Sequence, residues 1–571
     1  MTRARAPGPT EELQPDSLSD QAAGNTLALN PLIGLRGKDL TDSAAILMKA
    51  MVNEPIVASG QWLSFLGELG KIGAGQSQRG QQPGDKRFAD ATWKNSAAHR
   101  GLLQAYLAWG DALNGFIDKT SLSDIDKTRA RLIANIFIDA ASPTNNPISN
   151  PAAVRQFLDT GGASLWRGFQ NYVADLAENG GLPAQVDKSP FKLGVNIATT
   201  PGAVVFRNEV LEVIQYKADA PEVRKRPLII TPPQINKFYS VDLSPDKSLV
   251  QYLLKNGIQV FCVSWRNPTA KERDWGLDTY VEALDEGTDA VRDITASDDV
   301  TMMGACSGGI TSAAYAGWLA ARGEEKIKNI VSPVCVLDTA SGSDSAFASL
   351  VTPETLRAAK ENSRLRGVLD GQDLARVFAW MRPNDLIWNY WVNNYLLGNQ
   401  PPAFDILYWN ADTTSLPARL HHDYIDMYAT NPFVNANKLT LNGVAIDMRR
   451  VKVDAYVAAG VTDHITPWKG VYKTAKIYGD KTMFVLSNSG HLQSLLNPPT
   501  NPKASFAAGT AEAPDADTFS ATAEKKSGSW WPHWRDWLFE RSGAEVRAPA
   551  TLGNNRHPAG AAAPGTYVFE R

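Results

Sequence analysis

A cysteine at position 306 stands in a glycine-rich turn that suits a nucleophile. The stretch MGACSGG, residues 303–309, follows an apolar run and precedes a helical pattern. A nucleophile elbow of the form G-x-S-x-G needs such small residues because its strained strand-to-helix turn brings backbone segments close together. Cys306 takes the place of the serine in this pattern. The backbone N–H of Ser307, at the helix start, is expected to face a developing oxyanion.

Two further residues complete a candidate catalytic set. A thiol of pKa about 8.5 is only a few per cent thiolate at neutral pH, so Cys306 needs a base. His491 follows a strand-like run and a glycine-containing loop, and Asp463 lies just beyond the end of another strand-like run. The order nucleophile, acid, histidine is that of α/β-hydrolases. Taken singly, His491 could be structural and Asp463 could cap a turn.

Several neighbours are candidates for supporting roles. A second oxyanion donor is expected from the loop TPPQINKFY, residues 231–239, through the N–H of Ile235 or a neighbouring residue. Ser489 and Gln493 flank the histidine and are candidate contacts of the substrate pocket. His464, next to the acid, could assist or pack, and packing is favoured.

Other reactive residue types are expected to be inert. Cys262 and Cys335 lie within apolar runs and are predicted to be buried. The run His421-His422-Asp423 lacks a second ligand group at a suitable spacing, so we expect a solvated loop and no metal site. Cys306 is therefore the predicted reactive thiol.

The elements that position these residues follow an α/β rhythm from about residue 200. Short β-branched runs alternate there with amphipathic helical stretches, which favours a parallel sheet covered by helices. The expected strands lie near 203–205, 227–231, 257–264, 299–303, 327–337, 451–459 and 481–486. Residues 277–294 and 309–322 are predicted to be helices, so Cys306 lies in a strand-to-helix turn.

The predicted fold class is an α/β-hydrolase catalytic domain with an inserted cap, preceded by a mainly helical N-terminal domain. We expect residues 1–40 to be poorly ordered, 41–198 to form the helical domain, and 199–571 to form the catalytic domain with a cap at about 338–448. Residues 500–528 are rich in Ala, Thr, Ser, Pro and Lys and are predicted to be a linker or long loop. Tryptophans gather in the cap and near the C-terminus, where they either fill cores or line an apolar channel or surface.

Composition excludes several classes of protein. The 571 residues exceed what one hydrophobic core usually serves, and a net charge of −3 argues against nucleic acid as the main partner. No apolar run of eighteen uncharged residues occurs, so neither a signal peptide nor a transmembrane segment is expected. Three cysteines form no disulfide framework and favour the cytoplasm.

With these residues identified, the chain resembles the polyhydroxyalkanoate synthases over most of its length. The motifs that carry the resemblance are TPPQINKFY (231–239), VSWRNP (263–268), GACSG (304–308), DHITPW (463–468) and SGHLQSLLNPP (489–499). The run after the histidine and SWWPHW (529–534) resemble the class II, medium-chain enzymes of pseudomonads.

The resemblance implies a reaction and partners. Cys306 attacks the thioester of an (R)-3-hydroxyacyl-CoA, His491 takes the proton, CoA leaves, and a 3-hydroxyl then attacks a second acyl thioester. Asp463 either orients the histidine or activates that hydroxyl. No cofactor and no metal are implied. The family forms homodimers and works in the cytoplasm at the surface of polyhydroxyalkanoate granules, on the growing polyester chain.

Two alternatives stay open from the sequence. A cysteine-nucleophile α/β-hydrolase, an esterase or thioesterase, would resolve the acyl-enzyme with water. A non-enzymatic protein that coats inclusions would explain the clustered tryptophans, although the complete set of Cys306, Asp463 and His491 argues against it.

Overall fold

A computed structural model of the chain describes residues 37–342, 353–381, 383–463 and 465–571. The segment expected to be poorly ordered lies outside this range except for residues 37–40, which begin the first described helix. His464 also lies outside the described residues. Among the described helices, none is long and apolar enough to cross a bilayer.

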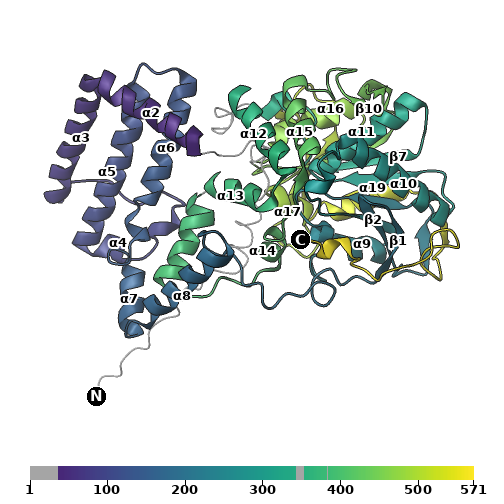
Figure 1. Cartoon of the computed structure of the whole chain (residues 1–571), viewed down its shortest axis with the longest axis horizontal. Coiled ribbons are helices and arrows are strands. Elements are labelled where there is room, and N and C mark those ends of the chain that lie inside the picture. Colours follow the sequence, from purple (N-terminus) through teal and green to yellow (C-terminus); the bar gives the residue numbers. More distant parts are fainter. Residues whose placement is uncertain (1–36, 343–352, 382, 464) are drawn as a thin grey trace.

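The N-terminal part is helical, as predicted, and lies to one side of the sheet (Figure 1). Its helices are α2 (Gly37–Asn53), α3 (Pro55–Gly73), α4 (Thr92–Asn95), α5 (Ala97–Lys119), α6 (Asp124–Ala140), α7 (Pro151–Asp159) and α8 (Ala163–Glu178). Side chains of Ser96, Ser123 and Asn150 accept hydrogen bonds from backbone N–H groups and so cap α5, α6 and α7. Phe116 and Ile117 of α5 are buried in the small core that this part forms.

A ten-stranded sheet forms the rest of the framework, in the order β1-β2-β5-β4-β6-β7-β12-β13-β14-β15. Its strands are β1 (Gly202–Arg207), β2 (Leu211–Tyr216), β4 (Leu228–Thr231), β5 (Val260–Trp265), β6 (Val300–Gly304), β7 (Ile327–Pro333), β12 (Asp454–Gly460), β13 (Met483–Ser487), β14 (Ser505–Thr510) and β15 (Glu524–Ser527). The central six strands pair in parallel. These six therefore confirm the predicted parallel sheet.

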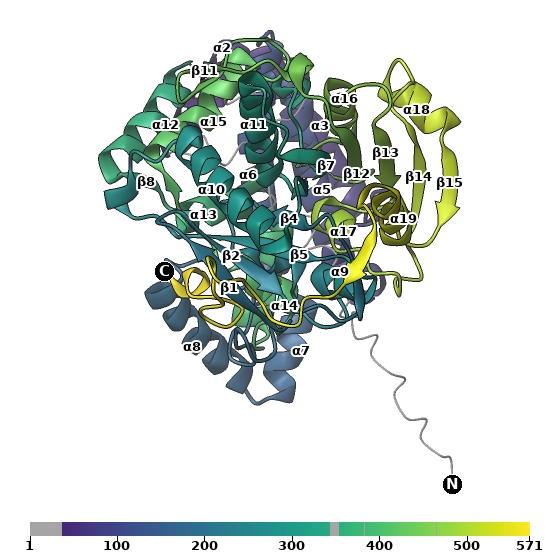
Figure 2. The same cartoon turned by 90° about the vertical axis from the view of Figure 1, so that its right-hand side faces the viewer.

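Both edges of the sheet are antiparallel, which corrects two expectations. On one edge β1 pairs with β2 and β2 with β5, so the sheet is mixed. On the other edge residues 500–528 were expected to be a linker or loop, but they form β14, α18 (Ala516–Thr522) and β15. Figure 2 shows this edge beside β13. The Ala-rich sequence has little β-propensity of its own. These residues form strands because they pair with a neighbouring strand through backbone hydrogen bonds.

Helices cover both faces of the sheet and bury its strands. The helices α10 (Leu277–Thr295) and α11 (Ser307–Arg322) pack on one face, against residues such as Ile229 and Phe261. The helices α9 (Leu249–Lys255), α17 (His491–Leu495) and α19 (Trp531–Arg541) pack on the other, against Ile230 and Tyr456. Trp530, Trp531 and Trp534 are fully buried there, so these tryptophans fill the core. The C-terminal aromatic cluster is structural.

The segment between β7 and β12 is mostly helical. Its described helices are α12 (Pro353–Arg366), α13 (Gly371–Met381), η8 (Asn384–Trp388), η9 (Trp391–Leu396), α14 (Asp405–Asn410) and α15 (Ala418–Thr430). It also holds two antiparallel pairs of short strands, β8 (Val368–Leu369) with β9 (Leu416–Pro417) and β10 (Thr440–Leu441) with β11 (Val444–Ala445). The expected solvated loop at 421–423 is wrong, because these residues lie within α15. His421 is fully buried there and its Nδ1 lies 2.8 Å from Ser363 Oγ.

Candidate active site

Cys306 lies between β6 and α11 in a backbone conformation rare for a side-chain-bearing residue. Its φ is +51° and its ψ −123°. Such strain persists only where the surroundings enforce it. A Cβ on Gly308 would lie 2.2 Å from the carbonyl oxygen of Thr231, and one on Gly309 would lie 2.6 Å from Cys335 Sγ. Glycines are therefore required beside the thiol, as the elbow pattern predicts.

Asp463 and His491 form a buried, hydrogen-bonded pair at the ends of β12 and β13. His491 Nδ1 lies 2.8 Å from Asp463 Oδ2. Asp463 Oδ1 accepts from the backbone N–H groups of Ile465 and Thr466, and Oδ2 also accepts from Thr466 Oγ1 at 2.6 Å. Four donors thus surround one carboxylate whose side chain has no exposed surface.

Electrostatics favour a charged pair at this position. Burial disfavours the imidazolium, but the carboxylate of Asp463 and the contact with Cys306 outweigh it and raise the pKa of His491 to about 10. Burial likewise opposes ionisation of Asp463, yet His491 and Thr466 lower its pKa. The arrangement stabilises an imidazole that has taken a proton, which is what a base for Cys306 must do.

Two tryptophans from the C-terminal part of the chain hold the segment that contains His491 in place. Trp530 donates its indole N–H to the carbonyl oxygen of Ser494 at 2.7 Å, and Trp531 donates to that of Leu495 at 3.1 Å. Both carbonyls belong to the short helix α17, which begins at His491. The buried tryptophans therefore position the imidazole through its backbone.

The oxyanion candidates lie around the start of α11. Ser307 is the first residue of this helix, and its N–H has no hydrogen-bond partner within the described part of the chain. The loop 231–239 is fastened to the same helix, since Gln234 Nε2 donates to Thr311 Oγ1 at 2.7 Å. The carbonyl oxygen of Ile235 accepts a hydrogen bond from the backbone N–H of Thr414 at 3.1 Å. Ile235 stays a prediction.

The sequence analysis missed two residues near the site, Thr466 and Tyr428. Thr466 is three residues after Asp463, a spacing typical of side-chain-to-backbone turns that could have identified it. Tyr428 of α15 has a buried hydroxyl with no hydrogen-bond partner among the described residues. Burial and the nearby Cys306 raise the pKa of Tyr428. One helical turn earlier, Tyr424 donates to Gln234 Oε1 at 3.0 Å.

The other predicted residues fall into two groups. Ser489 and Gln493 are half-buried on either side of His491, and their contact with substrate stays a prediction. Cys262 and Cys335 are fully buried free thiols, as expected. Burial is the main cause that raises the pKa of each thiol well above its ordinary value. Cys335 nevertheless packs directly against the elbow at Gly309.

The fold, together with the thiol of Cys306 in the turn between β6 and α11, defines the class of protein. The chain is an α/β-hydrolase fold protein with cysteine in the position of the nucleophilic serine. Residues 227–498 match the sequence family described as "alpha/beta hydrolase fold". Residues 84–253 match the family "Poly-beta-hydroxybutyrate polymerase (PhaC) N-terminus".

Full-length relatives identify the family within this class. The chain is 50% identical to poly(3-hydroxyalkanoate) polymerase 1 of Ectopseudomonas oleovorans over 97% of its length and 99% of the relative's. It is 46% identical to poly(3-hydroxyalkanoate) polymerase 2 of the same organism, over 95% of the chain and 96% of the relative. It is 37% identical to the polymerase subunit PhaC of Cupriavidus necator, over 85% and 83%. The chain belongs to the poly(3-hydroxyalkanoate) polymerase family, so the family, fold and synthase activity predicted from the sequence are confirmed.

Proposed function

We propose that polymerisation runs through an acyl thioester on Cys306. The sulfur attacks the thioester carbonyl of an (R)-3-hydroxyacyl-CoA, and His491 accepts the thiol proton. The bond from the carbonyl carbon to the CoA sulfur breaks, and CoA leaves with that proton. The 3-hydroxyl of an acyl group then attacks a second acyl thioester, which forms one ester bond and frees one thiol.

One observation carries this proposal. The thiol sits in a strained turn at the start of α11 and helps to raise the pKa of His491, whose imidazole is hydrogen-bonded to a buried carboxylate at 2.8 Å. Nucleophile, base and orienting group are the parts that an acyl transfer needs. The thiol of Cys306 lies at the carboxyl end of a parallel strand, where such sheets place their ligands.

The same contacts favour one role for Asp463. A carboxylate offers about four lone-pair positions, and here Ile465, Thr466 and His491 supply four donors to them. Such a carboxylate has no free position for a substrate hydroxyl. We propose that Asp463 orients His491, with Ser307 N–H and Ile235 N–H as the oxyanion donors.

Measurement of CoA release together with the product tests the proposal. Wild-type protein with a 3-hydroxyacyl-CoA should release CoA and form insoluble polyester, and Cys306→Ala should release none. Free hydroxy acid as the sole product would instead establish a cysteine hydrolase. Unchanged release of CoA by the alanine variant would exclude Cys306 as the nucleophile, and no release from wild type would favour a coating protein.

We further propose that the N-terminal helices hold the protein at the surface of polyester granules. Large apolar side chains on α3 and α8 are exposed, among them Trp62, Leu63, Trp166 and Phe169, at 56%, 67%, 61% and 55%. An exposed apolar patch of this kind marks a docking surface. In this division residues 41–198 contact the granule and residues 199–571 catalyse.

Sedimentation with washed polyester particles tests this surface. The double variant Trp166→Ser, Phe169→Ser should stay in the supernatant. Val546→Ser, which alters a partly exposed apolar residue of the catalytic part of the chain, should sediment like wild type. Light scattering tests the homodimer that the family resemblance implies. Loss of the dimer in the same double variant would assign this face to a second copy of the chain.

A further inference from the structure

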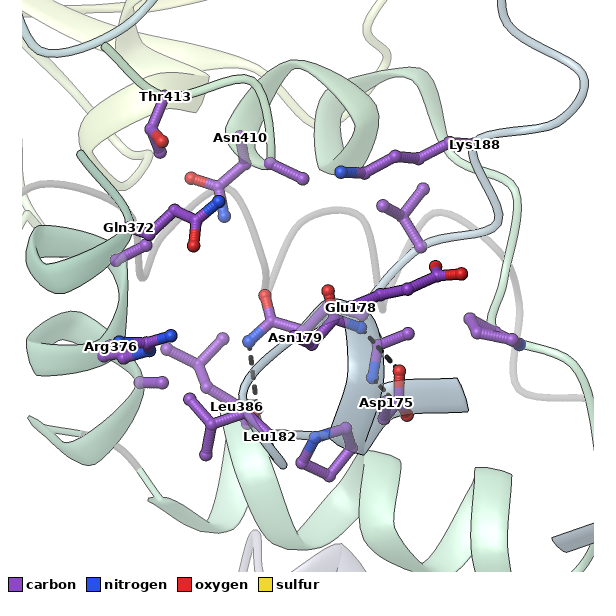
Figure 3. A pocket seen from close by; sticks show the side chains of 18 of the residues that line it. Asp175, Glu178, Asn179, Leu182, Lys188, Gln372, Arg376, Leu386, Asn410 and Thr413 are labelled. Atoms are coloured by element: carbon purple, nitrogen blue, oxygen red, sulfur yellow. Dashed lines mark hydrogen bonds between the residues drawn. The ribbon is translucent and has the colours of Figure 1, made fainter. Parts of the chain in front are cut away.

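A pocket of about 490 Å³ lies between α8 and the segment that joins β7 to β12 (Figure 3). Its volume is that of a small-molecule site. None of Cys306, Asp463 and His491 lines it. Ile235 and Asn236, which do line it, belong to the loop that Gln234 holds against α11, the helix that begins beside Cys306. The loop 231–239 is therefore shared between this pocket and the neighbourhood of the catalytic residues.

The lining of the pocket is rich in side-chain amides. Asn and Gln supply eight of its 28 lining residues. Four of the eight donate to other protein groups. Among the described residues, the buried Nδ2 of Asn236 has no partner. Gln372 and Gln400 are exposed and Asn410 is half-buried, so their amides are free to exchange solvent for a ligand.

Two of these free donors face the cavity together. Gln372 and Asn410 point into it from neighbouring elements in Figure 3. Asn236 is only 5% exposed, so its unpaired Nδ2 is costly unless a ligand accepts a hydrogen bond from it. The pocket therefore favours a ligand with several acceptors.

Charge excludes one class of ligand. Three carboxylates, those of Asp175, Glu178 and Asp187, line the pocket against two cations, Lys188 and Arg376. Arg376 also pairs with Asp373 at 3.1 Å. A net negative lining repels the phosphates of CoA. An uncharged ligand with carbonyl acceptors and apolar side chains fits better, because Leu182, Pro183 and Leu386 supply apolar surface.

The helix α8 links this pocket to the outside of the molecule. Asn171, Asp175 and Glu178 of α8 line the pocket, whereas Trp166 and Phe169 on the same helix are exposed. One helix therefore separates the pocket from the apolar face assigned above to the granule.

We infer that this pocket binds ester units of the growing polyester chain on their way from Cys306 to the apolar face of α8. The side-chain amides of Asn236, Gln372 and Asn410 donate to ester carbonyls. This inference rests on the proposed function, because it requires a polyester tethered to Cys306.

The double variant Gln372→Leu, Asn410→Leu tests the inference, since both positions lie outside the catalytic set. Loss of two donors should shorten the polymer roughly fivefold, which is the effect of one to two ordinary hydrogen bonds. The first equivalent of CoA released per enzyme and the KM for hydroxyacyl-CoA should not change. The matched control is Gln170→Leu, an exposed amide of α8 outside the pocket, which should leave polymer length unaltered.

Three results would overturn the inference. A raised KM and a slower first release of CoA, at unchanged polymer length, would make the pocket a substrate passage. Unchanged polymer length and unchanged kinetics would show that the polyester chain does not pass through the pocket. Shortening by Gln170→Leu to the same degree would attribute the effect to the α8 surface. Absence of CoA release from wild type would contradict the proposed function instead.

Discussion

Trp530 donates its indole N–H to the carbonyl oxygen of Ser494, 2.7 Å away and one helical turn beyond His491. Trp530→Phe should lower the rate of CoA release roughly tenfold, because a small displacement of a catalytic group is costly. Trp534 is the matched control, since it is equally buried but its indole N–H has no partner among the described residues. Trp534→Phe should lose stability without a comparable loss of rate. Equal rate losses in both variants would refute the positioning role.

Asp463→Asn should reverse the sign of the pKa shift of His491. Burial lowers the pKa of His491 and Asp463 is the main group that raises it to about 10. Without the carboxylate the pKa should fall below its ordinary value of about 6.5. NMR titration with labelled histidine resolves this, because the chain has only seven histidines. Asp293→Asn, at a partly buried carboxylate 3.8 Å from His557, should leave the His491 signal unchanged.

The same pair predicts how stability depends on pH. A raised pKa in the folded state means that His491 contributes to the free energy of unfolding fully below about pH 6.5 and loses this contribution as pH rises towards 10. Urea unfolding across that range should show the loss in wild type. If the stability of Asp463→Asn fell equally steeply with pH, the loss would arise from groups other than this pair.

Cys306→Ser should keep the fold and elongate poorly. Transfer of an acyl group from CoA to Cys306 exchanges one thioester for another, so the chain stays activated until a hydroxyl forms the more stable oxoester. Serine would form the oxoester on the enzyme and lose that driving force. Polymer mass per enzyme and the melting temperature are the measurements. A wild-type yield of polymer from this variant would contradict the thioester argument.

Gly308→Ala should destabilise the protein and abolish polymerisation. The added Cβ would meet the backbone oxygen of Thr231 at 2.2 Å, and backbone cannot move aside cheaply. The expected loss is about 1–3 kcal/mol or more. Gly67 in α3 has no atom within 4 Å of an added Cβ, so Gly67→Ala should gain about 0.5–1 kcal/mol. Urea unfolding of both variants gives the comparison.

Tyr428→Phe should lower activity without lowering stability. The hydroxyl is buried and unpaired among the described residues, so its removal costs no protein hydrogen bond. Cys306 is close enough to raise the pKa of Tyr428, so we expect this free hydroxyl to donate to an acyl group bound at the thiol. Tyr424→Phe is the contrast, because it breaks the bond to Gln234 and should cost about 1–3 kcal/mol. Wild-type rates in Tyr428→Phe would leave that hydroxyl without a role in transfer.

The sequence predicted the centre of the sheet better than its edges. Strands such as β6 and β12 are apolar runs buried on both faces. Such a run can be recognised in the sequence without knowledge of the strands that pair with it. The strand β14 reads SFAAGT and carries no β-branched run, so only its pairing with β13 makes it a strand. Residues 421–423 looked like a loop because local polarity hides that His421 packs inside the protein.

The same difference applies to the site. Cys306, Asp463 and His491 were predictable because each follows a strand in a recognisable order along the chain. Thr466 was within reach of a local rule. Tyr428 and Trp530 lie 122 and 39 residues along the chain from Cys306 and His491, and no local sequence pattern links them to the site.

The two faces of α8 have a consequence for where the protein resides. Its apolar face needs a water-insoluble phase, and the enzyme's own product is such a phase. On the proposals above, each molecule builds the material that retains it, beginning with its first few turnovers. The location of each molecule in the cell would then depend on whether it had been active. An inactive copy would bind only to granules that other copies had made.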